Sequence, residues 1–270
     1  METDWLQLWR GLVARVGKPL PGEIANRYKS YKRPKTERHD DLLDFVLGRI
    51  DSEDTVIDIG AGTGRWSIPI AHVAKDVTAL EPSTDMLKTL RENIEAAQLN
   101  NIQIKPCLWE KAAVNPHDIV VCAHAMYLSA DFSFFIRKME QYSRKTCYLA
   151  LRLPPYDGII SELSYTIYGC RHDSPNAIIA YNALFSMGIY VNILVEDGIK
   201  RWENDTLDEA FIRAKKHLYL NECSTYDKLI RDKLESCLNI SNSRYIWPDG
   251  MRSALLWWNR PGDYRKKASR

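Results

Sequence analysis

The most informative part of the sequence is VIDIGAGTGRW, residues 56–66. An apolar run that includes Asp58 leads into a turn in which every second residue is glycine, and a segment with helical character begins at Arg65. Small residues at such a turn let the backbone approach a bound ligand with no Cβ in the way, and the start of a helix offers free N–H groups. The stretch therefore predicts a strand, a ligand-binding turn and a helix. The alternating glycines are Gly60, Gly62 and Gly64.

A second acid fits the same site. The apolar run DVTAL, residues 76–80, ends directly before Glu81, which lies 21 residues after Gly60. A carboxylate at the tip of the second strand is placed to accept hydrogen bonds from both hydroxyls of a ribose. The dinucleotide fingerprint needs a different glycine spacing. Asp58 precedes the first glycine by two residues, where its carboxylate suits an ammonium group. We therefore expect a nucleoside that carries a cationic amino-acid part.

Short β-branched runs alternate with helical periodicity between residues 40 and 196. This rhythm predicts a doubly wound α/β sheet whose strands are parallel over most of its width, and the near-continuous apolar character of the strands agrees with burial on both faces. Ser83 is expected to cap the helix after the second strand. The strand candidates are TVIDI (55–59), DVTAL (76–80), NIQIK (101–105), DIVVCA (118–123), TCYLALRL (146–153) and GIYVNILV (188–195).

The chain divides into four expected segments. Residues 1–39 open with a Trp/Leu helix pattern and are expected to form an N-terminal helical lid, with Trp and Leu in the core. Residues 40–196 are the core domain. Residues 197–250 are expected to form a helical insertion that caps the substrate. One helix should start at the capping box of Thr206 and Glu209 and a second near Ser224. We expect both helices to lie over an edge of the sheet. Residues 251–270 are the last strand, MRSALLWW, and a basic tail.

Composition excludes several classes of protein. The 270 residues carry a formal net charge of +2, which gives no strong overall field for a nucleic-acid backbone or an anionic membrane. No apolar run is long enough to span a bilayer, and the first residues lack the pattern of a secretory signal. The six cysteines show no short-spaced pair, so we expect reduced core thiols, no metal site and a cytoplasmic location.

Together with ALEPSTDMLKTLREN (residues 79–93), the glycine-rich stretch resembles the class I S-adenosylmethionine-dependent methyltransferases, in particular the branch of the ubiquinone and menaquinone biosynthesis methyltransferases. The resemblance covers about residues 40–153. It implies a Rossmann-like sheet of seven strands with a reversed last strand, and S-adenosylmethionine as cofactor with S-adenosylhomocysteine as product. It also implies that Glu81 holds the ribose and that Pro82 or Ser83 borders the adenine. The residues implied around the methionine part are Asp58, Gly60, Ala61 and Gly62.

Two regions are less regular. The family usually places an acid after the third strand to receive the adenine amino group, but Leu108 stands there. Either Glu110 supplies the acceptor, or Trp109 covers the adenine ring. After the fourth strand, the resemblance places Ala123, His124 and Tyr127 near the reactive methyl group. His124 is a candidate general base, since an imidazole titrates near about 6.5; the competing interpretation is a structural role for both His124 and Tyr127.

We expect a methyltransferase that acts on a small or medium-sized organic acceptor. One alternative is an RNA or protein acceptor, because RYKSYKRPKTERH (27–39) interleaves basic and aromatic residues. The near-zero net charge argues against a nucleic-acid partner. LPPYDG (153–158) contains the Pro-Pro-Tyr of base-modifying amino-methyltransferases, but it follows the fifth strand instead of the fourth, so we interpret it as a turn before a helix. Another alternative is a protein that binds the cofactor without catalysis.

Overall fold

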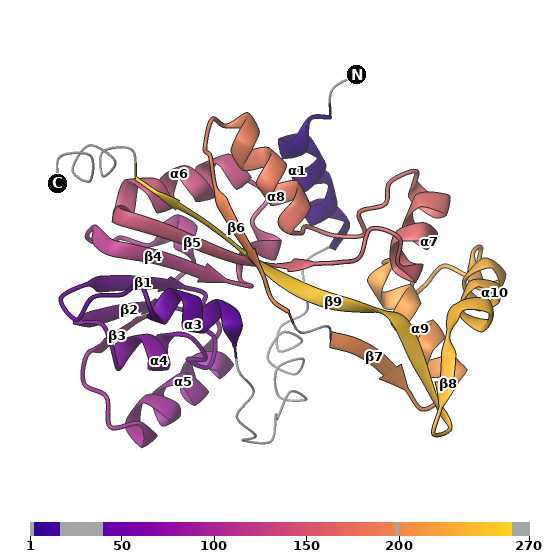
Figure 1. Cartoon of the computed structure of the whole chain (residues 1–270), viewed down its shortest axis with the longest axis horizontal. Helices are drawn as coiled ribbons and strands as arrows, with labels where there is room; N and C mark the ends of the chain where they lie inside the picture. The colour runs from indigo at the N-terminus through magenta and orange to yellow at the C-terminus, as the bar shows by residue number, and fades with distance from the viewer. Residues whose placement is uncertain (1–2, 17–39, 198–199, 261–270) are drawn as a thin grey trace.

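The computed structural model describes residues 3–16, 40–197 and 200–260. Its centre is a sheet with the strand order β3-β2-β1-β4-β5-β9-β6 (Figure 1). The first five strands along the chain pair in parallel, whereas β9 runs antiparallel to both β5 and β6. This order confirms the expected doubly wound, mostly parallel sheet with a reversed last strand. The strands are β1 (Thr55–Ile59), β2 (Asp76–Leu80), β3 (Ile102–Lys105), β4 (His117–Ala123), β5 (Ser143–Leu153), β6 (Asn192–Val195) and β9 (Arg244–Asn259).

Helices cover both faces of this sheet, as Figure 1 shows. Successive strand residues point to opposite faces, so Ile57 packs with α1, α6 and α8, whereas Val56 packs with α3 and α4. Both residues are fully buried. The helices around the sheet are α1 (Trp5–Val16), α3 (Asp41–Leu47), α4 (Ser67–Ala71), α5 (Thr84–Ala96), α6 (Phe132–Tyr142) and α8 (Ala177–Ser186), with short 3-10 helices η1 (Trp109–Lys111) and η2 (Met126–Leu128). Helix α7 (Ile159–Tyr168) belongs to a separate apolar cluster.

The N-terminal helix α1 belongs to the main core. Trp9 is fully buried, its indole N–H donates to the carbonyl oxygen of Ser129 at 2.9 Å, and its ring meets Phe132 edge to face. The expected packing of the Trp/Leu pattern is thus confirmed. The remainder of the predicted N-terminal lid, including Tyr28, Tyr31 and the basic stretch 27–39, lies outside the described residues.

A second, smaller sheet lies beyond the end of the first. Strands β7 (Lys200–Asn204) and β8 (Asn239–Ser241) pair with the N-terminal half of β9. Neither strand was expected, and β9 begins seven residues before the predicted strand at 251. The register between β7 and β9 shifts around Pro248. Because the extra residues of a bulge are left out of the ladder, a proline without an N–H fits there.

The insertion does contain the two expected helices, α9 (Leu207–His217) and α10 (Asp227–Cys237). The hydroxyl of Thr206 accepts from the Glu209 N–H at 3.1 Å, and the Glu209 carboxylate accepts from the Asp205 N–H at 2.9 Å, so the helix start is doubly capped. These helices do not lie over an edge of the central sheet. They pack with α7 around the buried Trp247, in a cluster of their own on the smaller sheet.

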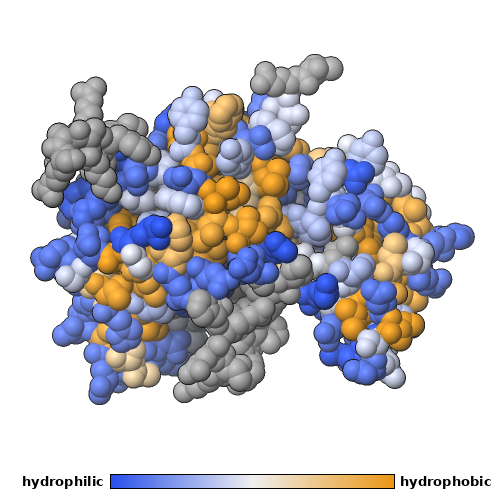
Figure 2. Space-filling model, in the orientation of Figure 1, coloured by the Kyte–Doolittle hydropathy of each residue, from blue (hydrophilic) through white to orange (hydrophobic). Residues whose placement is uncertain are grey.

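The edge strand β6 is shorter than the predicted run 188–195, because Gly188 with φ of +75° ends α8 and the chain only then enters the sheet. Figure 2 shows apolar side chains gathered over α8 and β6, where Phe185 and Ile193 are exposed. Within the described ranges, no helix has both the length and the apolar character needed to cross a bilayer. All six cysteines are free thiols, with Cys122 and Cys147 buried in strands.

Candidate active site

The glycine turn after β1 is closed by packing on one side and open on the other. Gly60 has φ of +73°, and a Cβ on it would lie 2.2 Å from the Cβ of Ala125. Gly62 has φ of +58°, but a Cβ there would come no nearer than 4.0 Å to another atom. Gly60 is therefore required where the turn touches the segment after β4, whereas Gly62 leaves free space above the turn.

Glu81 follows β2 and holds this turn in place. Its Oε2 accepts a hydrogen bond from the Gly62 N–H, and its Oε1 accepts one from the Ser83 N–H, both at 2.8 Å. The residue is only 7% exposed. Burial raises the pKa of this carboxyl group, while the two N–H bonds act in the opposite direction. Each oxygen has a second lone pair that can accept from a ligand hydroxyl. Pro82, next along the chain, is exposed.

Asp58 lies beneath the turn, in β1, and is 1% exposed. The hydroxyl of Ser67, the first residue of α4, donates to its Oδ2 at 2.5 Å. Burial raises the pKa of Asp58 from its ordinary 3.8 to about 6, and the nearby Glu81 carboxylate adds to this rise, whereas the Ser67 bond lowers it. An acid with this pKa changes its charge within the physiological range, so a cationic ligand group would decide its state.

The loop after β3 differs from the sequence expectation at Trp109. This residue is 2% exposed, its ring packs edge to face on Tyr142, and its indole N–H donates to the Phe135 carbonyl at 3.2 Å. Its side chain is thus part of the core, and an adenine contact through its ring would need this packing to change. This burial depends on α6, whose Ile136 and Met139 lie in the same cluster as Trp109.

Two neighbours of Trp109 remain accessible to a ligand. Glu110 is half-buried and accepts a hydrogen bond from the Ser129 hydroxyl at 2.7 Å, which connects this loop to the segment after β4. Leu108 is 49% exposed. The sequence pattern marked Leu108 only as the position where an acid is absent. An exposed apolar residue in this loop could instead pack on a flat aromatic ring, and its apolar side chain is the feature of the sequence that indicates this.

The two catalytic candidates after β4 contact each other. His124 has a left-handed backbone with φ of +57°, a conformation that is uncommon for any residue except glycine. Its Nδ1 lies 3.0 Å from the Tyr127 hydroxyl oxygen, which in turn accepts from the Arg152 N–H at 2.8 Å. Both side chains are half-buried, and Ala123 ends β4 directly before them. The fold therefore brings His124 and Tyr127 together beside the glycine turn, which Ala125 touches.

These residues meet at the carboxyl ends of β1, β2 and β4, which are neighbours in the sheet. Open α/β sheets bind ligands at this edge. A buried acid, an open glycine backbone, the Glu81 carboxylate and a His–Tyr pair thus lie at the same edge of the sheet. In the part of the chain that the structure describes, no group of three or more His, Cys, Asp or Glu side chains could hold a metal ion.

The chain is similar to several known proteins. Residues 50–166 match the sequence profile of a methyltransferase domain family. Two curated rRNA adenine N-6-methyltransferases of Bacteroides fragilis are 32% and 25% identical over 176 and 174 residues; each match covers 64% of this chain and 60% of the relative. A SAM-dependent methyltransferase from Thiobacillus denitrificans, solved with S-adenosyl-L-homocysteine, superposes with a TM-score of 0.54 at 12% identity, over 88% of this chain and 98% of that one.

Residues 50–166 are therefore similar to a methyltransferase domain, and the chain shares its fold with the solved methyltransferase of Thiobacillus denitrificans. The solved structure establishes the fold alone at this level of identity. The matches span 60% of the length of the two curated relatives.

Proposed function

We propose that this protein is an S-adenosylmethionine-dependent methyltransferase whose cofactor crevice lies between the glycine turn and Glu81. The observation that carries this proposal is the buried Glu81 carboxylate, which is held by two backbone N–H groups at the tip of β2 and keeps lone pairs for a ribose. The space above the neighbouring Gly62 is open, so a ligand held by Glu81 would have room over the turn.

The residues present fit S-adenosylmethionine at three points. Glu81 would accept from the ribose hydroxyls, and Gly62 would leave room for the chain between ribose and sulfur. The Asp58 carboxyl group, with a pKa raised to about 6 by burial, would gain from a nearby ammonium group. A pyrophosphate would instead repel both acids. When bound, S-adenosylmethionine supplies a methyl group on a positively charged sulfur, so the acceptor gains a methyl group, and S-adenosylhomocysteine is the product.

His124 and Tyr127 are the proposed catalytic pair. An acceptor that arrives protonated must lose its proton, and the His124 imidazole can take it. The Tyr127 hydroxyl, itself held by the Arg152 N–H, would fix the orientation of the imidazole ring. An acceptor whose nucleophilic atom is already unprotonated needs only to be positioned. Positioning alone can lower the activation barrier by roughly 7–11 kcal/mol in favourable cases.

We further propose a small or medium-sized organic acceptor. The segment after β4 reads Ala123-His124-Ala125-Met126-Tyr127, without the Pro-Pro-Tyr of base-modifying enzymes at this position, and the near-neutral net charge of +2 gives no strong attraction to a phosphate backbone. The LPPYDG motif instead forms the turn between β5 and α7, as expected. The quinone-biosynthesis branch remains a prediction from the sequence.

RNA is the second candidate acceptor, and the names of the curated relatives favour it. Those matches cover 64% of this chain, and one fold can serve methyltransferases with unrelated acceptors. A protein acceptor and a protein that binds the cofactor without catalysis are further alternatives from the sequence. Label transfer tests all of them.

The experiment has two stages. Calorimetry with S-adenosylhomocysteine on the wild type and on Glu81→Ala tests the crevice: equal affinities would remove the assignment of Glu81. Methyl-labelled cofactor is then incubated with the protein and a cell extract, which is separated into small molecules, RNA and protein. We expect label in the small-molecule fraction. Label only in RNA would identify the second candidate, and the absence of label beside intact cofactor binding would favour a non-catalytic protein.

A further inference from the structure

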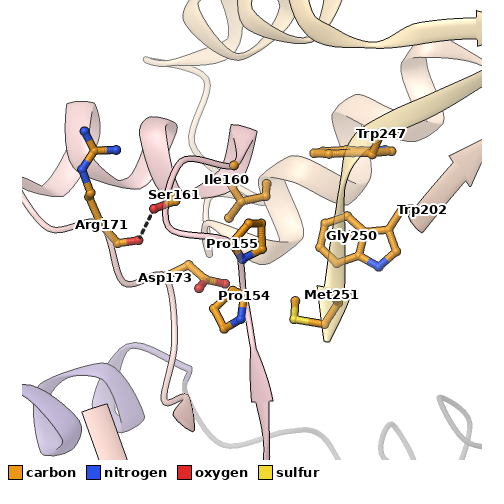
Figure 3. Close-up of a pocket in the computed structure, with 11 residues that line it drawn as sticks. Pro154, Pro155, Ile160, Ser161, Arg171, Asp173, Trp202, Trp247, Gly250 and Met251 are labelled. Carbon is orange, nitrogen blue, oxygen red and sulfur yellow. Dashed lines mark hydrogen bonds between the residues drawn. The ribbon is translucent and has the colours of Figure 1, made fainter. Parts of the chain in front are cut away.

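A small hollow with a cavity volume of about 40 Å³ lies beyond the end of β5 and opens to solvent (Figure 3). Pro154 and Pro155, which directly follow β5, form one side of it, and Trp202 of β7 lies opposite with Met251 of β9. The hollow is thus built between the central sheet and the smaller sheet, on the carboxyl edge where the cofactor crevice also lies. Its wall is largely apolar and aromatic.

The irregular pairing of β7 and β9 creates the aromatic wall. Arg201 pairs with Gly250 and Glu203 pairs with Ile246, so β9 has extra residues opposite Trp202. Trp247 lies in this stretch, and its ring meets Trp202 edge to face at a centroid distance of 5.1 Å. The Trp247 indole N–H donates to the Asn204 amide oxygen at 3.1 Å, which fixes the ring.

One face of Trp202 is already covered by α9. The His217 ring stacks on Trp202 at 4.5 Å, and the Arg213 guanidinium lies 5.5 Å from the same ring. Residues four apart share one face of a helix, so both groups approach Trp202 from the α9 side. The rest of the Trp202 ring borders the hollow, where the electron-rich face of an indole attracts cations.

Asp173 supplies a negative charge to the same hollow. Its side chain is 8% exposed, and its Oδ2 lies 4.0 Å from the Nδ1 of His217, which forms an ion pair with it when the imidazole is protonated. Within the described residues, no hydrogen bond reaches the Asp173 carboxylate, and its oxygens lie beside the two prolines in Figure 3. A carboxylate in the wall of an apolar hollow attracts a cationic ligand more strongly than one in bulk water.

The other charged residue of the lining does not compete for this acid. The Arg171 guanidinium lies over the rings of Tyr156 and Tyr165, at 4.9 and 5.1 Å. Figure 3 shows it directed away from the other labelled side chains. The hollow therefore combines a carboxylate with indole and proline surfaces, which is the chemistry that recognises an organic ammonium group.

We propose that this hollow binds the methyl acceptor through a protonated amine attached to an apolar or aromatic body, with Asp173 and Trp202 as the binding residues. This proposal rests on the proposed function for its link to methyl transfer. Ala150 of β5 pairs with Ala123 at the end of β4, and Pro154 lies four residues further, or about 13 Å along an extended chain. The ammonium group would thus bind the acceptor to the hollow, and the methylated atom would lie at the other end of the acceptor.

The test compares three probes of similar shape by ligand-observed NMR titration of the full chain: 2-phenylethylammonium, neutral 2-phenylethanol and anionic 3-phenylpropionate. We expect the ammonium compound to bind at least tenfold more tightly than the alcohol, and the anion more weakly than both. In Asp173→Asn the ammonium and the alcohol should bind within twofold of each other. Equal binding of the three probes to the wild type would overturn the proposal.

The matched control is Asp157→Asn, an exposed acid in the turn after Pro155, which should keep the tenfold preference. If Asp173→Asn fails to fold, Trp202→Leu should reduce the preference at least threefold, and an unchanged preference would contradict the proposal. Calorimetry with S-adenosylhomocysteine separates the two proposals, since Asp173→Asn should leave that affinity unchanged. Ammonium preference without label transfer would refute the methyltransferase proposal alone, whereas label transfer without ammonium preference would refute only the assignment of this hollow.

Discussion

The backbone N–H of Gly62 donates to the Oε2 of Glu81 at 2.8 Å, and together with the bonds from the Gly60 and Ala61 N–H groups to the Leu80 carbonyl oxygen it joins the turn after β1 to the tip of β2. Glu81 is thus used twice, because the carboxylate proposed to hold a ribose also fixes the turn over which the rest of the cofactor would lie. The neighbouring N–H of Ser83 completes the arrangement on the other oxygen. Cofactor affinity and local rigidity should therefore respond together to changes at this acid.

Glu81→Ala should weaken S-adenosylhomocysteine binding by at least thirtyfold, because hydrogen bonds to a charged group contribute about 1.5–3 kcal/mol each and Ala offers none. Isothermal titration calorimetry measures the change. Glu92→Ala, an exposed acid on α5, is the matched control and should bind like the wild type. A loss below threefold for Glu81→Ala would contradict the ribose role.

Gly60→Ala should destabilise the protein much more than Gly62→Ala. Both glycines have positive φ, which costs an alanine about 1–2 kcal/mol. Only at Gly60 does the new Cβ overlap with Ala125, at 2.2 Å, and overpacking adds about 1–3 kcal/mol. Urea unfolding measures both variants. If the two lose equal stability, the close contact between the glycine turn and the segment after β4 is wrong.

Ligand binding should depend on the ionisation of Asp58. Its pKa of about 6 lies above the ordinary value of 3.8, so the folded protein without ligand holds a proton there between these pH values. An ammonium group on the ligand favours the charged form. The affinity for S-adenosylhomocysteine should therefore rise about tenfold from pH 5 to pH 7.5, as calorimetry at several pH values would measure, and Asp58→Asn should remove most of this dependence.

The same shift has the opposite effect on the stability of the unliganded protein. Because the folded state binds more protons than the unfolded state between about pH 4 and 6, stability falls as the pH rises through this window, by up to about 3 kcal/mol for two pKa units. Asp58→Asn carries no charge at either pH, so its stability relative to the wild type should increase from pH 4 to pH 7. A constant difference in urea unfolding would argue against the raised pKa of Asp58.

His124→Ala and Tyr127→Phe separate catalysis from binding. If the imidazole takes a proton from the acceptor, His124→Ala should lower kcat by about 100-fold or more, and Tyr127→Phe should lower it less, since it removes only the orienting hydroxyl group. Label incorporation into the acceptor measures both, and calorimetry with S-adenosylhomocysteine should show wild-type affinity. An unchanged kcat in His124→Ala would assign this residue a structural role.

The sequence predicted the central sheet and its acids well for a physical reason. A parallel strand buried on both faces must be apolar, so the ends of β1 and β2 and the acid after β2 could be read from local residues. Glycine at positions 60 and 62 is demanded by positive φ, a requirement that acts within the turn itself. Gly60 also depends on Ala125, 65 residues further along, and that contact was not predictable.

The features that were missed depend on contacts between distant segments. Strands β7 and β8 are short and half polar, and they exist because β9 extends to pair with them. Trp109 is in the core because α6 covers it, although its position in a loop made it look like a ligand contact. Asp173 belongs to no sequence motif. Only the folded chain brings it to the same hollow as Trp202, which lies 29 residues away.

Strand β9 has a mechanical consequence. From Arg244 to Asn259 it is shared by both sheets, with β7 and β8 on its first half and β5 and β6 on its second. The hydrogen-bonded backbone of a strand resists stretching and shear. Because β9 continues from one sheet into the other, no flexible linker separates the two sheets along this strand. An occupant pressing on Met251 would strain the same backbone that, a few residues later, pairs with β5 and β6 in the larger sheet.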